Sequence, residues 1–216
     1  MSKNVSSADN QQGSPLCQNI QILADDPSET TRRAPFSEES VKAYLLGALH
    51  DGTLSKNKRF RISQKGKEWL QFLQKLFNKV GCNAWIYKEG LNRKVYVIET
   101  LANFLDFQFN PLQLESSDEK AAYIRGFFDA EGGIPRSSEA RFYIQLVQND
   151  KGKLEKLKKL LKDLGIESGK IHNPSQKVDP DYWRMYILAK FQKKFFDKIE
   201  TWHPRKIRTL RKRMMI

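Results

Sequence analysis

The chain of 216 residues is 39% hydrophobic, enough for one large domain or two small ones, and its 38 Lys and Arg against 25 acids give a net charge of +13. This surplus favours a polyanion, above all nucleic acid, as partner, with a merely basic surface as the alternative. Only Cys17 and Cys82 are present, without metal-ligand spacing, and no apolar run reaches the ~20 residues of a membrane helix, which excludes a disulfide framework, a zinc site and a membrane span. We expect an intracellular protein that is neither exported nor embedded in a membrane.

Polar residues dominate the start of the chain. Residues 1–35 are rich in Ser, Asn, Gln, Asp and Pro, a composition that cannot offset the entropy of ordering, and they predict a flexible leader. The run Ser37-Glu38-Glu39 then predicts a helix start, because a serine caps the first turn and acids favour its positive dipole. This helix is expected over residues 38–50 and ends in an apolar stretch with a glycine, an acid and a second glycine, Tyr44 to Gly52.

The first predicted sheet follows this helix. The period changes to alternation over residues 59–64, typical of a strand with one apolar face and with Arg59 and Arg61 on the other. An amphipathic helix over 68–80 precedes Gly81, a residue suited to a helix C-cap. A last strand over residues 94–98 is expected to turn Lys94 and Tyr96 to the same outward face.

The same order recurs roughly eighty residues later, a sign of an internal repeat. After a linker over 110–116, the capping box Ser116 to Glu119 opens a helix that carries the stretch Tyr123 to Gly132. A strand over 143–148, a helix over 153–164 that ends at Gly165 and a strand over 184–188 then match the first copy. The domains are therefore predicted as an N-terminal half over 36–109 and a C-terminal half over 117–216, which closes with a basic helix.

The second stretch resembles the signature of the LAGLIDADG homing endonucleases. It matches at Ile124, Gly126, Phe127, Phe128, Asp129, Ala130 and Gly132, with Glu131 in place of the second acid of the motif. The resemblance implies an α+β fold of two pseudo-symmetric αββαββα halves, each with an antiparallel saddle-shaped sheet, packed through the two motif helices. The first stretch departs from the pattern, because its glycine and acid are one residue closer and His50 replaces a small residue. Either Gly47 is shifted by one position or the helix end is tightened.

The two motifs predict a pair of carboxylates. A glycine inside a helix costs roughly 1 kcal/mol, and close helix packing gives Gly47 and Gly126 a reason to be there. Such packing would bring Asp51 and Glu131 together, where their repulsion favours a hard divalent cation. Oxygen-only ligands indicate Mg²⁺ or Mn²⁺, with Ca²⁺ expected to bind without supporting cleavage. The alternative is that each acid and glycine only forms a turn.

Other roles follow from the resemblance alone. Gln64 and Gln148 match a polar residue that holds metal-bound water, with an ordinary sheet-edge glutamine as the alternative. Lys206 matches a lysine that stabilises charge during phosphodiester hydrolysis. We expect Asp129 to make helix-end hydrogen bonds at the interface, and His50 to be a surface or interface residue rather than a phosphate ligand.

Basic, tyrosine and glutamine side chains on the outward strand faces and hairpin tips suit base edges and phosphates. The predicted DNA-binding residues are Lys56, Lys58, Arg59, Arg61, Lys94, Tyr96, Arg136, Arg141, Tyr143, Gln145, Arg184, Tyr186, Arg205 and Arg208. Because the two halves differ in these residues, the target is expected to be asymmetric and the protein a monomer. Family likeness further implies a long double-stranded DNA site cut to leave 3′ overhangs.

Two other functions remain open on the same fold. Some LAGLIDADG proteins are maturases that help intron RNA to fold, and the intact acids do not exclude such a role. Others are DNA-binding regulators with an added helix-turn-helix, for which this chain offers no room. Cleavage and intron splicing, assayed separately, would discriminate these functions.

Overall fold

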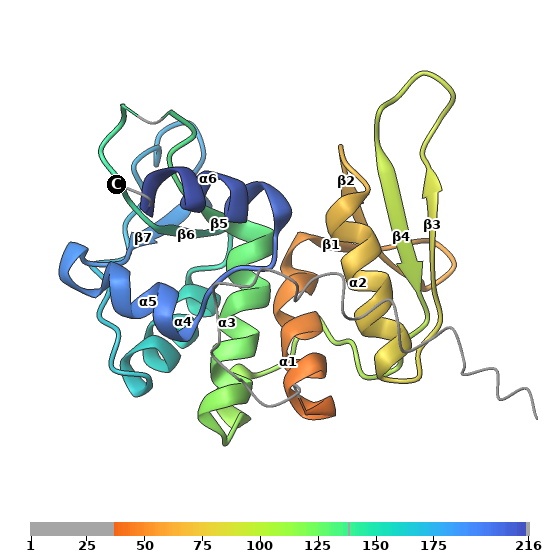
Figure 1. Cartoon of the computed structure of the whole chain (residues 1–216), viewed down its shortest axis with the longest axis horizontal. Coiled ribbons are helices and arrows are strands. Elements are labelled where there is room, and N and C mark those ends of the chain that lie inside the picture. Colours follow the sequence, from red (N-terminus) through yellow and green to blue (C-terminus); the bar gives the residue numbers. More distant parts are fainter. Residues whose placement is uncertain (1–36, 138, 215–216) are drawn as a thin grey trace, which may run out of the picture. The chain divides into compact units, whose positions relative to one another are not determined.

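The computed structural model describes residues 37–137 and 139–214, so the predicted leader over 1–35 lies outside the described residues. The expected α+β arrangement of two halves with antiparallel sheets is confirmed. In Figure 1 the helices α1 (Glu38–Ala48) and α3 (Ser117–Glu131) stand side by side at the centre, with one sheet on either side of the pair. Within these described residues no helix has the length and hydropathy needed to cross a membrane.

The first half contains one four-stranded sheet in the order β1-β2-β4-β3. Its elements after α1 are η2 (Leu49–Asp51), β1 (Gly52–Leu54), β2 (Phe60–Gln64), α2 (Glu68–Lys79), β3 (Ala84–Lys88) and β4 (Tyr96–Thr100). No α-helix closes this half as the αββαββα pattern predicts. The connection to α3 contains only the short 3₁₀ turn η3 (Pro111–Gln113).

The second half contains a three-stranded sheet in the order β5-β6-β7. Its elements after α3 are β5 (Gly132–Gly133), β6 (Gln145–Gln148), α4 (Lys151–Asp163), β7 (Trp183–Tyr186), η4 (Ala189–Phe191), α5 (Gln192–Lys198) and α6 (Pro204–Met214). Where the first half has β3, this half has only the isolated bridges Ser168 to Ile187 and His172 to Arg184. The repeat is therefore complete in its motif helix and first hairpin, and reduced afterwards.

The expected caps are present in both copies. Ser37 accepts a hydrogen bond from the amide of Ser40, and Ser116 and Glu119 form the reciprocal capping box. Gly81 and Gly165 follow α2 and α4 with φ of 71° and 69°, a left-handed conformation that glycine adopts without strain. Buried apolar side chains from both halves form a single cluster, so the halves share one core.

The two motif helices touch at their glycines. A Cβ on Gly47 would lie 2.1 Å from the carbonyl oxygen of Tyr123, and one on Gly126 would lie 2.0 Å from the carbonyl oxygen of Tyr44. Each glycine thus meets the residue three positions before the other glycine. Because the contact is reciprocal, Gly47 and Gly126 occupy equivalent places and Gly47 is not shifted.

The short first motif is accommodated at the helix end. Helix α1 ends at Ala48, one residue after its glycine, and Leu49–Asp51 continue as a 3₁₀ turn, whereas α3 stays α-helical to Glu131. Three 3₁₀ residues rise about 6 Å, as do the four α-helical residues 128–131 of the second copy. The tightened end therefore carries Asp51 to the same height as Glu131 with one residue fewer.

The predicted face of the last strand in the first half is wrong. Strand β4 begins at Tyr96, which pairs with Gln64, and Ile98 pairs with Ile62, so Tyr96 shares the core-facing side with Ile98. Lys94 lies before the strand and is exposed. The outward positions of β4 are instead Val97 and Glu99. Alternation alone places Val97 in the core, whereas the buried Val97 lies on the sheet face opposite to Ile98.

Candidate active site

The two motif acids lie at the ends of the paired helices, where the chain enters each sheet. Burial raises the pKa of Asp51 to about 6, against a hydrogen bond from Gln64 and the charge of Lys206. Burial raises the pKa of Glu131 to about 7, with the negative charge of Asp51 as the second cause. Both motifs bury their acids, and the charge of Asp51 raises the pKa of Glu131. The fold therefore brings two carboxyl groups close together at the ends of the motif helices.

A buried lysine accompanies the acids. Lys206 on α6 is 2% exposed and donates hydrogen bonds to the carbonyl oxygens of Phe128 and Asp129, the latter at 2.9 Å. These are carbonyls of the last turn of α3, where a cation is favoured by the helix dipole. Burial lowers the pKa of Lys206 to about 8, against the charges of Asp129, Glu131 and Asp51. The predicted lysine therefore lies within electrostatic reach of both acids.

Asp129 is enclosed by protein groups. It accepts hydrogen bonds from the Tyr44 hydroxyl at 2.8 Å, from the Trp202 amide at 2.9 Å and from the Thr201 hydroxyl. The indole nitrogen of Trp69 in turn donates to Tyr44 at 3.0 Å. These bonds join α2, α1, α3 and the segment just before α6, which places Asp129 at the interface of the halves.

His50 is the structural counterpart of Asp129. Its Nε2 lies 2.8 Å from the hydroxyl of Tyr123, the tyrosine equivalent to Tyr44, and its Nδ1 lies 3.2 Å from Nε2 of Gln148. Burial, with the charge of Lys153 as the second cause, lowers the pKa of His50 to about 3, so the ring is neutral at physiological pH. The histidine therefore stands where the first acid of the motif stands in the other copy.

The two predicted glutamines occupy equivalent strand positions but make different contacts. Register aligns Gln64 with Gln148, because Gly52 pairs with Ile62 and Gly132 with Leu146. Gln64 donates to Asp51 at 2.6 Å, whereas Gln148 contacts His50 and accepts a hydrogen bond from the Asn149 amide.

The acids could hold a cation only with help from outside the protein. Among the described residues no group donates a hydrogen bond to the carboxylate of Glu131, and no cluster of three or more His, Cys, Asp or Glu side chains forms a metal site. Asp51 and Glu131 would therefore share the cation with water or phosphate oxygens. Such a partial, all-oxygen ligand set fits Mg²⁺, which keeps several waters when bound to protein.

Two grooves open beside the acids. One of about 790 Å³ is lined by Glu131 and Lys206 together with Tyr143 and Gln145 of the second sheet. The other, of about 640 Å³, is lined by Gln64 and His203 on the side of the first sheet. Arg136 and Arg205 line both grooves. Two residues of the second half that were predicted to contact DNA, Tyr143 and Gln145, thus lie next to the candidate active site.

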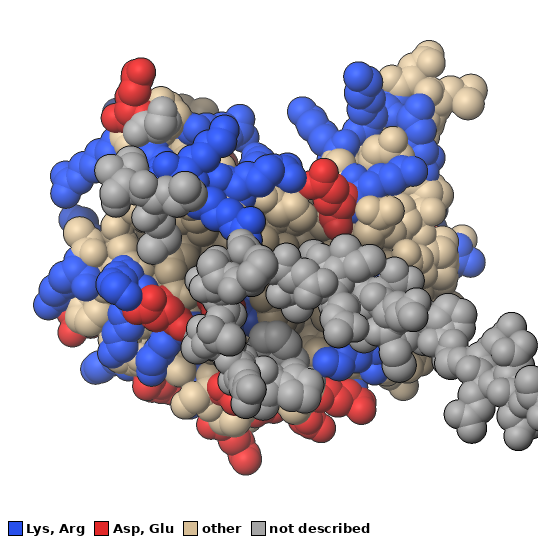
Figure 2. All heavy atoms as spheres, in the orientation of Figure 1, with Lys and Arg blue, Asp and Glu red and all other residues tan. Residues whose placement is uncertain are grey.

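Charge is divided between the two ends of the motif helices. In Figure 2 Lys and Arg gather over the upper part of both halves, where α6 and the hairpins lie, and acids lie mostly along the lower edge. The first turns of α1 and α3 at that edge carry Glu38, Glu39, Asp118 and Glu119. The grooves therefore open on the basic face, the face suited to a polyanion.

The remaining predicted DNA-binding residues fall into three groups. Arg184 and Tyr186 share the outward face of the second sheet, where the guanidinium carbon lies 5.3 Å from the tyrosine ring centroid. Exposed loop positions are Lys56, Lys58, Lys94 and Arg141. Arg59, Arg61 and Arg208 are held in ion pairs, Arg208 with Glu68 at 3.0 Å.

Several residues of the site are not evident in the sequence. His203 caps α6, because its Nδ1 accepts a hydrogen bond from the Arg205 amide at 3.2 Å. Glu99 contacts both arginines of the first sheet, and Tyr87 contacts Arg61. Histidine is an unusual helix cap, and the contacts of Tyr87 and Glu99 depend on strand pairing, so no local signal in the sequence indicates these roles.

Comparison with known proteins identifies the fold. The model of the LAGLIDADG-like domain matches the chain twice, over residues 39–110 and 118–200. The chain belongs to this family. The doubled motif of the sequence thus marks two LAGLIDADG halves, as expected. None of the curated proteins matches the chain.

Solved structures share this fold at low identity. The homing endonuclease I-DmoI in complex with DNA and Mn is 20% identical with a TM-score of 0.59, and the match covers 76% of this chain and 98% of that one. I-DmoI with DNA and Ca is 21% identical with a TM-score of 0.57, covering 82% and 99%. The N-terminal LAGLIDADG domain of DUF199/WhiA is 20% identical with a TM-score of 0.59, covering 76% and 82%.

Proposed function

We propose that the protein is a site-specific endonuclease that hydrolyses both strands of DNA with a divalent cation. The observation that carries the proposal is the coupled pair Asp51 and Glu131 at the ends of two touching helices, beside basic grooves. The target would be long and asymmetric, since the outward side chains of the two sheets differ, and cleavage would leave 3′ overhangs. The protein would act inside the cell as a monomer.

The pair of acids suits a hard cation. Each carboxyl has a raised pKa, and the charge of Asp51 contributes to that of Glu131, so a cation between them would relieve an unfavourable concentration of negative charge. Asp51 and Glu131 would be its protein ligands. When bound, Mg²⁺ or Mn²⁺ supplies Lewis acidity to a water and to the attacked phosphate. Solved complexes of I-DmoI contain DNA with Mn or with Ca, which supports this choice of ligand.

The side chains of the protein itself perform the positioning. Gln64 orients one oxygen of Asp51 through its hydrogen bond. Lys206 places a positive charge near both acids and is held there by two backbone carbonyls, so its charge opposes the negative charge that develops during phosphodiester hydrolysis. Arg205 and Arg136, which line both grooves, would hold phosphates on either side of the scissile bonds.

Cleavage selection from a randomised duplex library with Mg²⁺ tests the proposal. The wild type should enrich one asymmetric site, and Glu131→Gln should bind that site with affinity within about threefold while cutting at least a hundredfold more slowly. Glu155→Gln on α4 is the matched control, since it removes the same charge from an exposed side chain that lines neither groove. Equal cutting by Glu131→Gln would remove this residue from catalysis.

Binding without cleavage is the second candidate. WhiA shares the fold, so the fold alone does not separate a nuclease from a binding protein. The solvent-accessible Glu131 favours the nuclease, because a pure binding face gains nothing from an unpaired acid beside phosphates. Sequence-selective binding with no cutting in Mg²⁺ or Mn²⁺ would favour the second candidate, and stimulation of intron splicing would favour an RNA maturase.

A further inference from the structure

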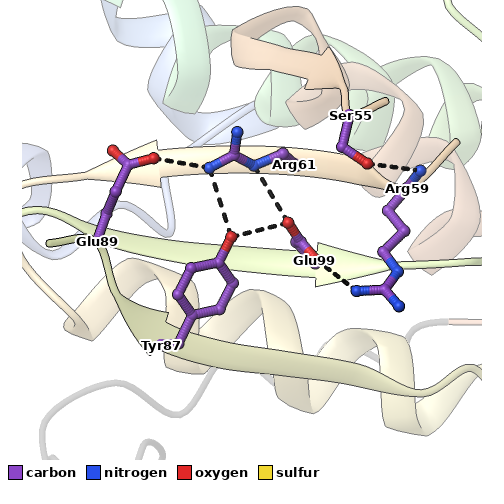
Figure 3. Close-up of polar contacts among 6 residues, drawn as sticks. All are labelled: Ser55, Arg59, Arg61, Tyr87, Glu89 and Glu99. Atoms are coloured by element: carbon purple, nitrogen blue, oxygen red, sulfur yellow. Dashed lines mark hydrogen bonds and ion pairs between the residues drawn. The ribbon is translucent and has the colours of Figure 1, made fainter. Parts of the chain in front are cut away.

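A compact polar cluster occupies the outward face of the first sheet (Figure 3). Arg61 on β2 lies opposite Glu99 on β4, and Tyr87 on β3 lies opposite Val97, so these side chains share one face. Arg59 precedes β2 and Glu89 follows β3. In Figure 3 Glu99 lies between the two arginines, while Tyr87 and Glu89 approach Arg61.

Glu99 is the centre of this cluster. Its Oε1 accepts a hydrogen bond from the Tyr87 hydroxyl at 2.8 Å and lies 3.3 Å from Nε of Arg61. Its Oε2 accepts a hydrogen bond from Nη1 of Arg59 at 3.3 Å. The side chain of Glu99 is only 9% exposed. Although burial opposes ionisation, the hydrogen bonds from Tyr87 and Arg59 lower the pKa of Glu99, so it carries its charge at neutral pH.

The charges of the cluster cancel. Two arginines face two carboxylates, since Nη2 of Arg61 also donates to Glu89 at 2.8 Å. A neutral cluster adds little to the attraction of phosphates, which depends on net positive charge. It does hold the arginines in place. Arg61 donates from Nη2 to Glu89 and Tyr87 and lies in ion-pair distance of Glu99 through Nε, while Arg59 donates from Nη1 to Glu99. Within the described residues no acceptor contacts Nη1 of Arg61 or Nη2 of Arg59, so each arginine keeps one amino group for an outside acceptor.

A pinned guanidinium with open N–H groups suits one base in particular. Guanine presents two acceptors, O6 and N7, in the major groove, and arginine is their commonest partner. A mobile arginine can reach a phosphate of any sequence, whereas a fixed one must be matched by the base at its position. The cluster therefore favours base reading over backbone contact.

We propose that Glu99, together with Tyr87, is a specificity-determining positioning residue that fixes Arg59 and Arg61 to read guanines in the half of the target under the first sheet. The inference rests on the proposed function as a DNA endonuclease. The second sheet differs, because the register equates Gln145 with Arg61 and Tyr186 with Glu99. Its half-site should therefore be read independently of Glu99.

The test compares Glu99→Gln, Tyr87→Phe and the wild type on the randomised library and in salt titrations of binding. Glu99→Gln should lose about tenfold of its guanine preference in one half-site only. Its binding to random duplex should gain a steeper salt dependence, by about one in the log–log slope, because a released arginine can reach a phosphate. Tyr87→Phe should lose preference with an unchanged slope, since no charge is removed. Glu155→Gln, with the same charge change on α4, should alter neither quantity.

Two outcomes overturn the inference. Retained guanine preference in Glu99→Gln would show that Glu99 does not position the arginines, and the nuclease proposal would stand. Equal loss in both half-sites, with a lower melting temperature, would assign Glu99 a purely structural role. If Glu99→Gln does not fold, Tyr87→Phe decides by the same criterion. A wild type that selects no sequence would instead remove the proposed function itself.

Discussion

The contact between the motif helices can be tested by adding one methyl group. In Gly126→Ala the new Cβ would lie 2.0 Å from the carbonyl oxygen of Tyr44 and 2.8 Å from the amide nitrogen of Ala48. Ordinary contact requires roughly 3.5 Å, so the two backbones must separate locally by about 1.5 Å. Backbone atoms cannot rotate away as a side chain tip can. The helices themselves have to move.

The expected loss of stability follows from two opposed effects. Alanine gains about 1 kcal/mol over glycine in a helix, while forced overpacking costs about 1–3 kcal/mol for flexible side chains and more against rigid backbone. We expect a net destabilisation of about 3 kcal/mol, or a melting temperature lower by about 10 °C for a domain of this size. Gly47→Ala should behave alike, because its contact with Tyr123 is reciprocal.

Urea and thermal unfolding measure this effect, with cleavage as a second readout. Gly66→Ala is the matched control: its Cβ would meet no atom within 4 Å, so stability should change by less than about 1 kcal/mol. Cleavage by Gly126→Ala should fall by about a hundredfold even where the variant is folded, since a displacement of about 1 Å is enough to misplace the acids. A Gly126→Ala protein that melts within about 2 °C of the wild type would refute the close contact as the determinant of the fold.

Three further predictions concern the site. Lys206→Met should slow cleavage about a hundredfold and leave duplex affinity within about threefold, because the charge of Lys206 lowers the pKa of Asp51 and Glu131. A single-turnover cleavage rate near that of the wild type would contradict this prediction. Burial and the charge of Lys206 lower the pKa of His203 from 6.5 to about 3 in the folded protein. Below pH 6.5 the histidine is protonated in the unfolded chain but not in the folded one, so the free energy of unfolding falls as the pH drops. Urea unfolding at pH 7 and pH 5 measures this effect: between the two, the free energy of unfolding should fall by about 2 kcal/mol less in His203→Asn than in the wild type. Equal falls would exclude His203 as the source of the pH dependence. Duplex binding should weaken with salt at a log–log slope of about −5, as roughly six phosphate contacts require, and a flat response would exclude the groove as the binding site.

The sequence predicts local features that depend on neighbours along the chain. Ser37 and Ser116 cap their helices as expected, and Gly81 ends its helix in the left-handed conformation, because each device acts within one turn. The close contact between Gly47 and Gly126 is also predictable from the sequence. A glycine that recurs inside an apolar helix lowers helix stability, which indicates close packing against another backbone. Repetition of the motif supplied the long-range information that a single copy lacks.

The features that were missed depend on contacts across the fold. The face of Tyr96 follows from pairing with Gln64, which alternation within the strand cannot reveal when apolar residues occupy both sides. His50 was expected on the surface or at an interface, and its equivalence to Asp129 appears only from the matched tyrosines Tyr44 and Tyr123. Nothing in the sequence distinguishes Glu99, because an isolated acid in a strand has no local signature. Its importance appears only with its partners on adjacent strands.

The basic C-terminal helix α6 and the residues just before it are tied into both halves. Trp202, which precedes the helix, packs against Tyr44 of the first half with ring centroids 4.7 Å apart. Arg213 near the helix end donates to the carbonyl oxygens of Ser137 and Ala140 in the first hairpin of the second half. Arg205 is exposed to both grooves, while the next residue, Lys206, is buried beside the acids. Successive helical residues are rotated by about 100°, so one short turn of α6 presents Arg205 to the grooves and Lys206 to the acids.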